Sequence, residues 1–328
     1  MYEKEKRILE AKHVTKRFQL SRNRILTACE DVSLNFYKNH TLGIVGESGC
    51  GKSTFARMAV GLEKPDSGEI FFRGRNVLEI KGEELRLSRR NIQMIFQDPS
   101  EAFNPRMKLK EIICEPLLNF RLINRKQMDS KARELLEMVE LPGSFAERFP
   151  HDMSGGQRQR IGIARALALE PEVIICDEIT SALDVSAQKA IVELLINLQN
   201  KKQVSIGFIT HDLALVQQFA HQVAVMYLGN IVEIINGNEV SVNARHPYTK
   251  ELLDSIFDVH MDFSKKIVSI ESEVPSPLNV SEGCPFRNRC NACRKVCETE
   301  KPVLKEIEPY HLVACHQYND SFYIGGCL

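Results

Sequence analysis

The sequence predicts an α/β protein built around a parallel β-sheet, with a phosphate-binding loop at the end of one strand. Short apolar strands alternate with helical stretches through most of the chain, which is typical of this fold class. A glycine-rich segment between an apolar strand and a helix supplies the loop. The chain has 328 residues, 43% of them hydrophobic and 26% charged, which is enough for one large core and smaller subdomains.

The apolar runs and the helix signals place the elements of this fold in order. Strands are expected at 41–45, 92–96, 173–176 and 204–209. Helices are expected at 52–60, 154–169, 187–199 and 213–219. The stretch 109–149 has a mostly helical pattern, amphipathic over 131–140, and predicts an inserted helical subdomain. After residue 253 the pattern ends, and 274–315 is rich in Pro, Cys and charge, which predicts a small loop-rich appendage.

Charge and hydropathy exclude several classes of protein. Lys+Arg and Asp+Glu both number 43, so the chain has no net basic field to hold nucleic acid. The first twelve residues are charged and lack the apolar core of a signal peptide. No apolar run approaches the ~18 residues of a membrane-spanning helix. If the protein works at a membrane, we expect other chains to span it.

The glycine-rich segment is the first chemical signal. Its glycines allow the backbone N–H groups to converge on phosphate oxygens, and the following helix adds its positive dipole end. Lys52 is expected to reach the β- and γ-phosphates, and the Ser53 hydroxyl to bind Mg²⁺. Cys50 is expected to contribute only its backbone. The predicted nucleotide-binding residues are Gly46, Glu47, Ser48, Gly49, Cys50, Gly51, Lys52, Ser53 and Thr54.

Further polar residues follow other predicted strands. Asp177 and Glu178 end an apolar strand, and in a parallel sheet that end faces the ligand crevice. Asp177 is expected in the Mg²⁺ shell, and Glu178 is expected to orient and deprotonate the attacking water. His211 and Gln97 also follow predicted strands. His211 is expected to contact the γ-phosphate, and Gln97 is expected to bind Mg²⁺. Two acids after a strand would, in isolation, be equally compatible with a solvated loop.

A second helix start has the features of an anion site. The segment consists of Ser154, Gly155, Gly156 and Gln157. Ser154 is a good N-cap, and the glycines allow another backbone to approach closely. One nucleotide does not need two such sites in one chain. The spacing therefore leads to the hypothesis of a head-to-tail pair, in which each Ser154 end closes over the partner's phosphate loop.

Together these residues resemble the ABC ATPase family over about 8–257. Residues 46–54 are similar to its Walker A motif, Gln97 to its Q-loop and 154–157 to its signature motif. Residues 173–178 are similar to Walker B, 181–184 to the D-loop and His211 to the switch histidine, all in the family order. The resemblance implies an ABC ATPase domain over 1–257, with an N-terminal antiparallel β-subdomain and a helical subdomain at about 105–168.

The resemblance also implies roles for single residues. Glu178 would be the catalytic base, assisted by His211, Gln97 and Lys52. Phe18 would stack on adenine, and Asp184 would belong to the ATP site as part of the D-loop. Mg²⁺ would be held by Ser53, Gln97 and Asp177. Two residues depart from the family pattern: Met153 replaces the usual Leu, and Ile179 replaces the usual Pro and makes hydrolysis rate and coupling less predictable.

Several segments resemble the ATPases of oligopeptide, dipeptide and nickel importers, in particular their second ATPase chain: 46–57, 97–106, 246–249 and the tail. This implies ATP-driven peptide import at the cytoplasmic face of the cell membrane, as a peripheral subunit. The implied partners are a second, homologous ATPase, two permeases and, indirectly, an extracytoplasmic solute-binding protein, with a permease coupling helix in the groove near Gln97. Alternatives are a nickel or metal-chelate importer, an exporter ATPase, and a soluble non-transport ABC ATPase.

The last cysteines form a cluster in the implied C-terminal region, 258–328. Cys284, Cys290, Cys297 and Cys315 match the cysteine pattern of that importer subfamily, and Cys293 is additional. Four thiolates suit an iron–sulfur cluster or tetrahedral zinc. The resemblance favours a [4Fe–4S] cluster, zinc is the alternative, and a third possibility is that the cysteines only pack a small subdomain.

Overall fold

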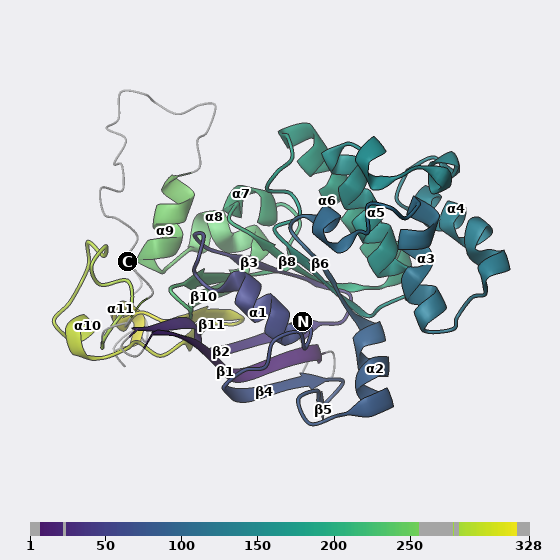
Figure 1. Ribbon diagram of the computed structural model, residues 1–328. Coiled ribbons are helices and arrows are strands. Elements are labelled where there is room, and N and C mark those ends of the chain that lie inside the picture. Colours follow the sequence, from purple (N-terminus) through teal and green to yellow (C-terminus); the bar gives the residue numbers. More distant parts are fainter. Residues whose placement is uncertain (1–6, 22–23, 256–277, 279–281, 320–328) are drawn as a thin grey trace.

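The computed structural model describes residues 7–21, 24–255, 278 and 282–319. In these residues an eight-stranded sheet forms the centre and a four-stranded sheet lies below it in Figure 1. The strands are β1 Arg7–Ser21, β2 Arg24–Tyr37, β3 Thr41–Val45, β4 Ser67–Phe72, β5 Arg75–Asn76, β6 Ile92–Ile95, β7 Val173–Asp177, β8 Ser205–Thr210, β9 Gln222–Tyr227, β10 Asn230–Asn236, β11 Lys305–Glu308 and β12 His311–Val313.

The helices surround these sheets. The α-helices are α1 Lys52–Ala59, α2 Gly82–Asn91, α3 Leu109–Asn119, α4 Met128–Met138, α5 Gly155–Leu167, α6 Val185–Lys202, α7 Leu213–Val216, α8 Val240–Asn243, α9 Pro247–Asp254, α10 Val296–Thr299 and α11 His316–Asn319. Short 3₁₀ helices are η2 Pro99–Ala102, η3 Arg125–Gln127, η4 Gly143–Glu147, η5 Pro150–Asp152 and η6 Gly237–Glu239.

The large sheet has the strand order β11-β12-β10-β9-β3-β8-β7-β6. Strands β9, β3, β8, β7 and β6 are parallel, whereas β10, β12 and β11 continue the sheet in antiparallel pairs. Val45 lies opposite Thr210, and Asp177 lies opposite Ile209. The carboxyl ends of β3, β8 and β7 therefore meet at one edge of the sheet, where the sequence places its candidate residues.

Side chains point alternately to the two faces of the large sheet, so the core is divided into two layers. Val45, Cys176 and Phe208 face the layer that contains the helical region and α6. Ile44 and Ile175 face the other layer, which also contains α1 and the four-stranded sheet. Both faces of the parallel strands are therefore buried, as expected for strands with continuous apolar runs.

The four-stranded sheet has the order β2-β1-β4-β5, with antiparallel pairing throughout. Its long ribbon β1–β2 reaches the phosphate loop, because the Cys29 thiol in β2 donates a hydrogen bond to the Gly51 carbonyl at 3.6 Å. The predicted helical stretch contains α3, α4 and short 3₁₀ helices, which pack with α5 to the right of the sheet in Figure 1.

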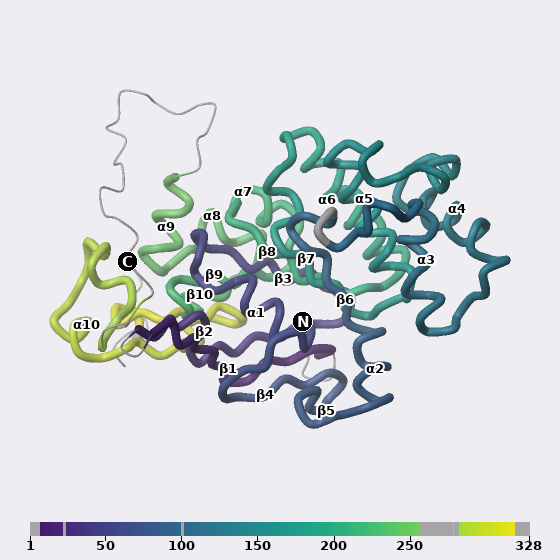
Figure 2. Tube along the Cα trace, viewed as in Figure 1, coloured from purple at the N-terminus to yellow at the C-terminus, as the bar shows by residue number. Residues whose placement is uncertain are grey.

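The tail has more regular structure than its sequence predicts. Strands β11 and β12 extend the central sheet beyond β10, and the tail lies against β2 and β10 (Figure 2). The Glu233 carboxylate in β10 is fully buried, and its Oε1 lies 2.7 Å from His311 Nε2 in β12. The same carboxylate accepts hydrogen bonds from the backbone N–H groups of Arg245 and His246, at 2.7 and 3.0 Å. The buried contact between His311 and Glu233 joins the tail to the core. None of the helices in the described residues is long and apolar enough to cross a membrane.

Candidate active site

The predicted phosphate loop lies between β3 and α1, in a backbone shape that depends on glycine. Gly51 has a φ of 108°, and a Cβ atom there would lie 1.9 Å from the Ala28 carbonyl oxygen. A Cβ atom at Gly46 would lie 2.1 Å from the Met226 carbonyl oxygen. Backbone carbonyl groups of the neighbouring strands thus lie very close to the loop, and only glycine fits at these two positions.

Lys52 begins α1 and lies inside the loop. Its Nζ donates to the carbonyl oxygens of Gly46 and Glu47, at 2.8 and 2.9 Å, and lies 3.6 Å from Glu178 Oε1. The Lys52 side chain is only 3% exposed. A cation is therefore held at the centre of the loop, in the position from which it can contact the phosphates of a nucleotide.

Ser53 and Asp177 bring two oxygen donors together. The Ser53 hydroxyl donates to Asp177 Oδ1 at 2.9 Å, although 124 positions separate the two residues. Burial raises the pKa of Asp177, while the Ser53 hydrogen bond and Lys52 act in the opposite direction. Hydroxyl and carboxylate oxygens are the hard ligands that Mg²⁺ prefers. The residues present therefore fit a magnesium ion.

Glu178 has a different orientation from Asp177 because its backbone is left-handed, with a φ of 49°. Its carboxylate Oε2 lies 3.4 Å from Gln97 Nε2, and the same amide lies 3.3 Å from the Ser181 hydroxyl. The structure therefore brings Lys52, Asp177, Glu178 and Gln97 together in one cluster. Gln159 in α5 donates to the Gln97 carbonyl at 2.8 Å, which connects the helical region to this cluster.

Two further predicted site residues, His211 and Phe18, lie on or next to other strands. His211 follows Thr210 at the end of β8, between the ends of β3 and β7, and is exposed. Phe18 in β1 is half-buried, and the Lys16 ammonium lies 5.2 Å from the centre of its ring. Phe18 is on the same β1–β2 ribbon that contacts Gly51. Its role toward adenine stays a prediction.

The second helix start has the predicted cap. The Ser154 hydroxyl accepts a hydrogen bond from the Gln157 N–H at 3.4 Å, and the Gln157 side chain accepts one from the Ser154 N–H at 3.0 Å. Among the described residues, no hydrogen bond joins this helix start to the phosphate loop of the same chain. Ser154 and Gly155 are exposed, so another chain can reach them.

Asp184 and Ile179 shape the segment after Glu178. Asp184 caps α6 by accepting the Ala187 N–H at 3.0 Å, and hydrogen bonds, first that from the Ser186 hydroxyl, lower its pKa. Ile179 is completely buried, so its side chain anchors a segment in which the usual Pro is absent. Cys50 is buried beside Lys52, and burial raises its pKa, which agrees with a backbone role for this cysteine.

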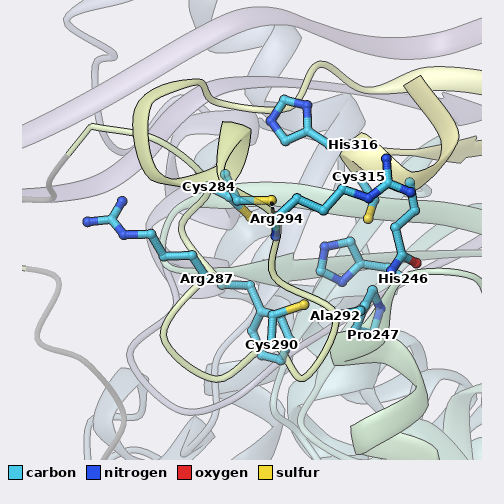
Figure 3. A pocket seen from close by; sticks show the side chains of 12 residues that line it. His246, Pro247, Cys284, Arg287, Cys290, Ala292, Arg294, Cys315 and His316 are labelled. Carbon is cyan, nitrogen blue, oxygen red and sulfur yellow. Dashed lines mark hydrogen bonds between the residues drawn. The ribbon is translucent and has the colours of Figure 1, made fainter. Parts of the chain in front are cut away.

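The predicted cysteine cluster lines one cavity (Figure 3), with Cys284, Cys290, Cys297 and Cys315 in its wall. The free space is about 10 Å³, roughly one water molecule. Burial raises the pKa of Cys284 to about 11 and also raises those of Cys290 and Cys315. In the described part of the chain, no group of three or more His, Cys, Asp or Glu residues could hold a metal ion as arranged. The donor set suits a soft metal, but the space does not admit a cluster unless side chains move.

One residue near the phosphate loop was missed by sequence reasoning. Arg289, in the tail, contacts the Glu47 carboxylate through both terminal nitrogens, each at 2.9 Å. Its only sequence signal was an arginine beside Cys290, which gives no indication of a partner 242 positions away.

The loop, the buried lysine and the two acids at one sheet edge define a P-loop nucleotide-hydrolysing protein. Comparison with known proteins gives the family. A model described as "ABC transporter" matches 29–181, and one described as "Oligopeptide/dipeptide transporter, C-terminal region" matches 232–297. The chain is 46% identical to the oligopeptide transport ATP-binding protein AppF of Bacillus subtilis (strain 168), over 89% of this chain and 90% of that one.

Two further matches agree. The chain is 47% identical to the oligopeptide transport ATP-binding protein OppF of Salmonella typhimurium, over 88% of this chain and 87% of that one. A dimeric ATP-binding cassette, solved in a post-hydrolysis state with ADP and Pi, matches with a TM-score of 0.64 and 30% identity, over 70% of this chain and 98% of that one. The chain belongs to the ABC transporter family, among its oligopeptide transport ATP-binding proteins.

Proposed function

We propose that the chain hydrolyses ATP to ADP and phosphate and thereby powers oligopeptide import by a multi-subunit ABC transporter. The observation that carries the proposal is the meeting of Lys52, Ser53, Asp177, Glu178 and Gln97 at one sheet edge. The relatives AppF and OppF, named as oligopeptide transport ATP-binding proteins, indicate the cargo. The matched C-terminal model is also described as a region of oligopeptide and dipeptide transporters.

The chain's own residues have separate tasks in this reaction. The loop N–H groups and Lys52 bind the phosphates, and His211 contacts the γ-phosphate. Ser53, Gln97 and, through water, Asp177 would hold Mg²⁺, which would neutralise the charge that develops on the phosphate. Glu178 orients the attacking water and accepts its proton. Phe18 stacks on adenine.

The proposed arrangement of chains follows from the second helix start. Two ATP molecules are enclosed between this chain and a second, homologous ATPase, each closed by the partner's signature helix. The exposed cap at Ser154 and the dimeric state of the matched cassette support this arrangement. The domain plan is an ATPase domain over 1–257 with a helical subdomain at about 105–168, followed by a C-terminal region over 258–328.

A groove on the surface supports a permease contact. It has a volume of about 490 Å³ and lies between α2, α3 and α5, beside β6, which leads to Gln97. Arg86 lies over the Phe120 ring at 4.5 Å, and Arg165 pairs with Glu115 at 2.7 Å in its wall. We assign this groove to a short cytoplasmic helix of a permease, and we propose that the chain acts at the cytoplasmic face of the membrane.

Capture of the complex tests this function. Tagged chain with Glu178→Gln is expressed in its native cells and recovered from solubilised membranes with ATP present. Two permeases and a second ATPase are expected by mass spectrometry, because ATP stays bound and the two ATPases stay closed. Arg89→Glu in the groove wall is expected to reduce permease recovery at least about tenfold, since it reverses a charge at the contact.

Two results would contradict the transporter. One is recovery of the Glu178→Gln chain alone, and the other is its recovery with ribosomes or DNA, which would indicate a soluble ABC ATPase. The control for Arg89→Glu is Lys189→Glu, on the exposed side of α6, where the side chain is 77% exposed. The permeases should accompany this control in normal amounts, and equal loss in both variants would remove the groove assignment.

For the tail we propose a [4Fe–4S] cluster held by Cys284, Cys290, Cys297 and Cys315, with zinc as the alternative. Four thiols around one cavity support the proposal, and the side chains must move apart to admit the metal. Full-length chain purified without oxygen is expected to contain about four iron and four sulfide per chain. Cys290→Ser should lose both, whereas exposed Cys293→Ser should keep them. If the purified chain contains zinc and no iron, the zinc alternative is correct. A chain that contains neither metal contradicts both proposals.

A further inference from the structure

A buried arginine from the tail lies between two carboxylates of the ATPase core. Arg289 contacts Glu47 in a two-pronged pair at 2.9 and 2.9 Å, and its Nη2 also contacts Glu251 in α9 at 2.7 Å. The Arg289 side chain is 3% exposed, and each of the two glutamates is 23% exposed. Planar two-pronged pairs are the strong and directional form of an ion pair. Exposed pairs contribute little by comparison.

An aromatic wall fixes the arginine in this place. Its guanidinium carbon lies 5.7 Å from the ring centres of Tyr227 and Phe286 and 5.8 Å from that of Tyr248. The three rings also contact one another, with centres 4.6 to 5.5 Å apart. Core and tail thus build the wall together, and it holds the guanidinium in a single orientation.

Glu47 is held at both its backbone and its side chain. Its N–H donates to the Tyr248 hydroxyl at 2.9 Å, and its carbonyl accepts from Lys52 Nζ at 2.9 Å. Glu47 stands in the second position of the phosphate loop, directly after Gly46. An unpaired carboxylate at this position would repel the phosphates that the loop binds. Arg289 supplies the positive charge that compensates it.

We propose that the cysteine-rich tail is part of the ATP site and that Arg289 is a positioning residue for the phosphate loop. Arg289 acts through Glu47: it fixes the loop in its binding shape and neutralises the carboxylate next to the phosphates. Arg289 does not touch the reacting atoms. It therefore affects the affinity for ATP and not the rate of the chemical step. This inference rests on the proposed ATPase function.

The test compares full-length variants by MgATP titration calorimetry and steady-state hydrolysis. Arg289→Met is expected to raise both Kd and KM for ATP about tenfold, with kcat within about twofold, because an ion-paired contact that shapes the loop is lost. Arg289→Lys keeps the positive charge but cannot form the planar two-pronged pair. It is expected to raise Kd and KM about threefold. The matched control is Arg245→Met, which removes another contact between core and tail, the exposed pair with Glu308 at 3.1 Å. It should leave Kd and KM unchanged.

A second comparison separates this role from general damage to the fold. In a Glu47→Gln background, Arg289→Met should change KM less than about threefold, because the carboxylate that Arg289 compensates is gone. A tenfold rise in that background as well, or an unchanged KM in the single variant, would overturn the inference. If Arg289→Met does not fold, Arg289→Lys in both backgrounds gives the same comparison. Failure of the wild-type chain to bind ATP would instead reject the ATPase function itself.

Discussion

Glu178→Gln is expected to lower the kcat for ATP hydrolysis at least about 100-fold while changing the Kd for ATP by less than about threefold. Glutamine has the size of glutamate but cannot accept a proton, and general-base catalysis contributes roughly 10²–10⁴-fold. The Glu178 carboxylate lies 3.4 Å from the Gln97 amide and 3.6 Å from Lys52 Nζ, so it faces the space where the terminal phosphate is expected. Phosphate release and MgATP titration measure the two quantities.

The control is Glu170→Gln, which removes an exposed carboxylate just before β7. This variant should hydrolyse ATP at the wild-type rate. Turnover near normal in Glu178→Gln would remove Glu178 from the role of base. A loss of ATP binding in the same variant would mean that its ion pair with Lys52 supports the loop, which a catalytic base alone does not explain.

The phosphate site could be predicted because its signals are local. A buried strand, a glycine-rich turn and a helix follow one another within about twenty residues. The strand was predicted at 41–45 and β3 has the same bounds. The pairing of Ser53 with Asp177 could also be anticipated, because strand ends in a parallel sheet meet at one edge. Fold class and these contacts therefore follow from patterns within each segment.

Helix limits were less predictable because caps set them. The helix expected at 187–199 extends over Val185–Lys202. Its start is fixed by the Asp184 cap, which accepts the Ala187 N–H at 3.0 Å, and its end by left-handed Gln203, with a φ of 57°. Apolar periodicity identifies the buried turns of such a helix, while the exposed first and last turns carry no apolar signal.

The contacts of the tail could not be predicted. Strand β11 is mostly exposed and charged, with the sequence Lys-Glu-Ile-Glu, so it lacks the apolar alternation of a strand. Arg289 and Glu47 are ordinary charged residues until the fold brings them together. A single sequence holds no signal for a pair of this kind, because neither residue type nor spacing selects the partner. The domain boundary predicted near residue 257 lies outside the described residues.

Lys52→Met is expected to give the opposite profile to Glu178→Gln, with ATP binding itself lost. Methionine keeps the unbranched shape of lysine but removes its charge. Lys52 is buried in the loop, and we propose that it contacts the β- and γ-phosphates. We expect the Kd for MgATP to rise about 100-fold, which corresponds to about 2.7 kcal/mol. Calorimetry on the full-length chain measures it, with Lys201→Met on the exposed last turn of α6 as the control.

The two active-site variants separate binding from chemistry because their residues are neighbours with different tasks. Lys52 Nζ and Glu178 Oε1 are 3.6 Å apart, so a general disturbance of the site would affect both variants alike. If Lys52→Met binds ATP normally, the loop lysine does not reach the phosphates. If both variants lose binding to the same extent, the Lys52–Glu178 pair acts as one structural unit. Only loss of binding in one and loss of turnover in the other agrees with a lysine that binds phosphate and a glutamate that accepts a proton.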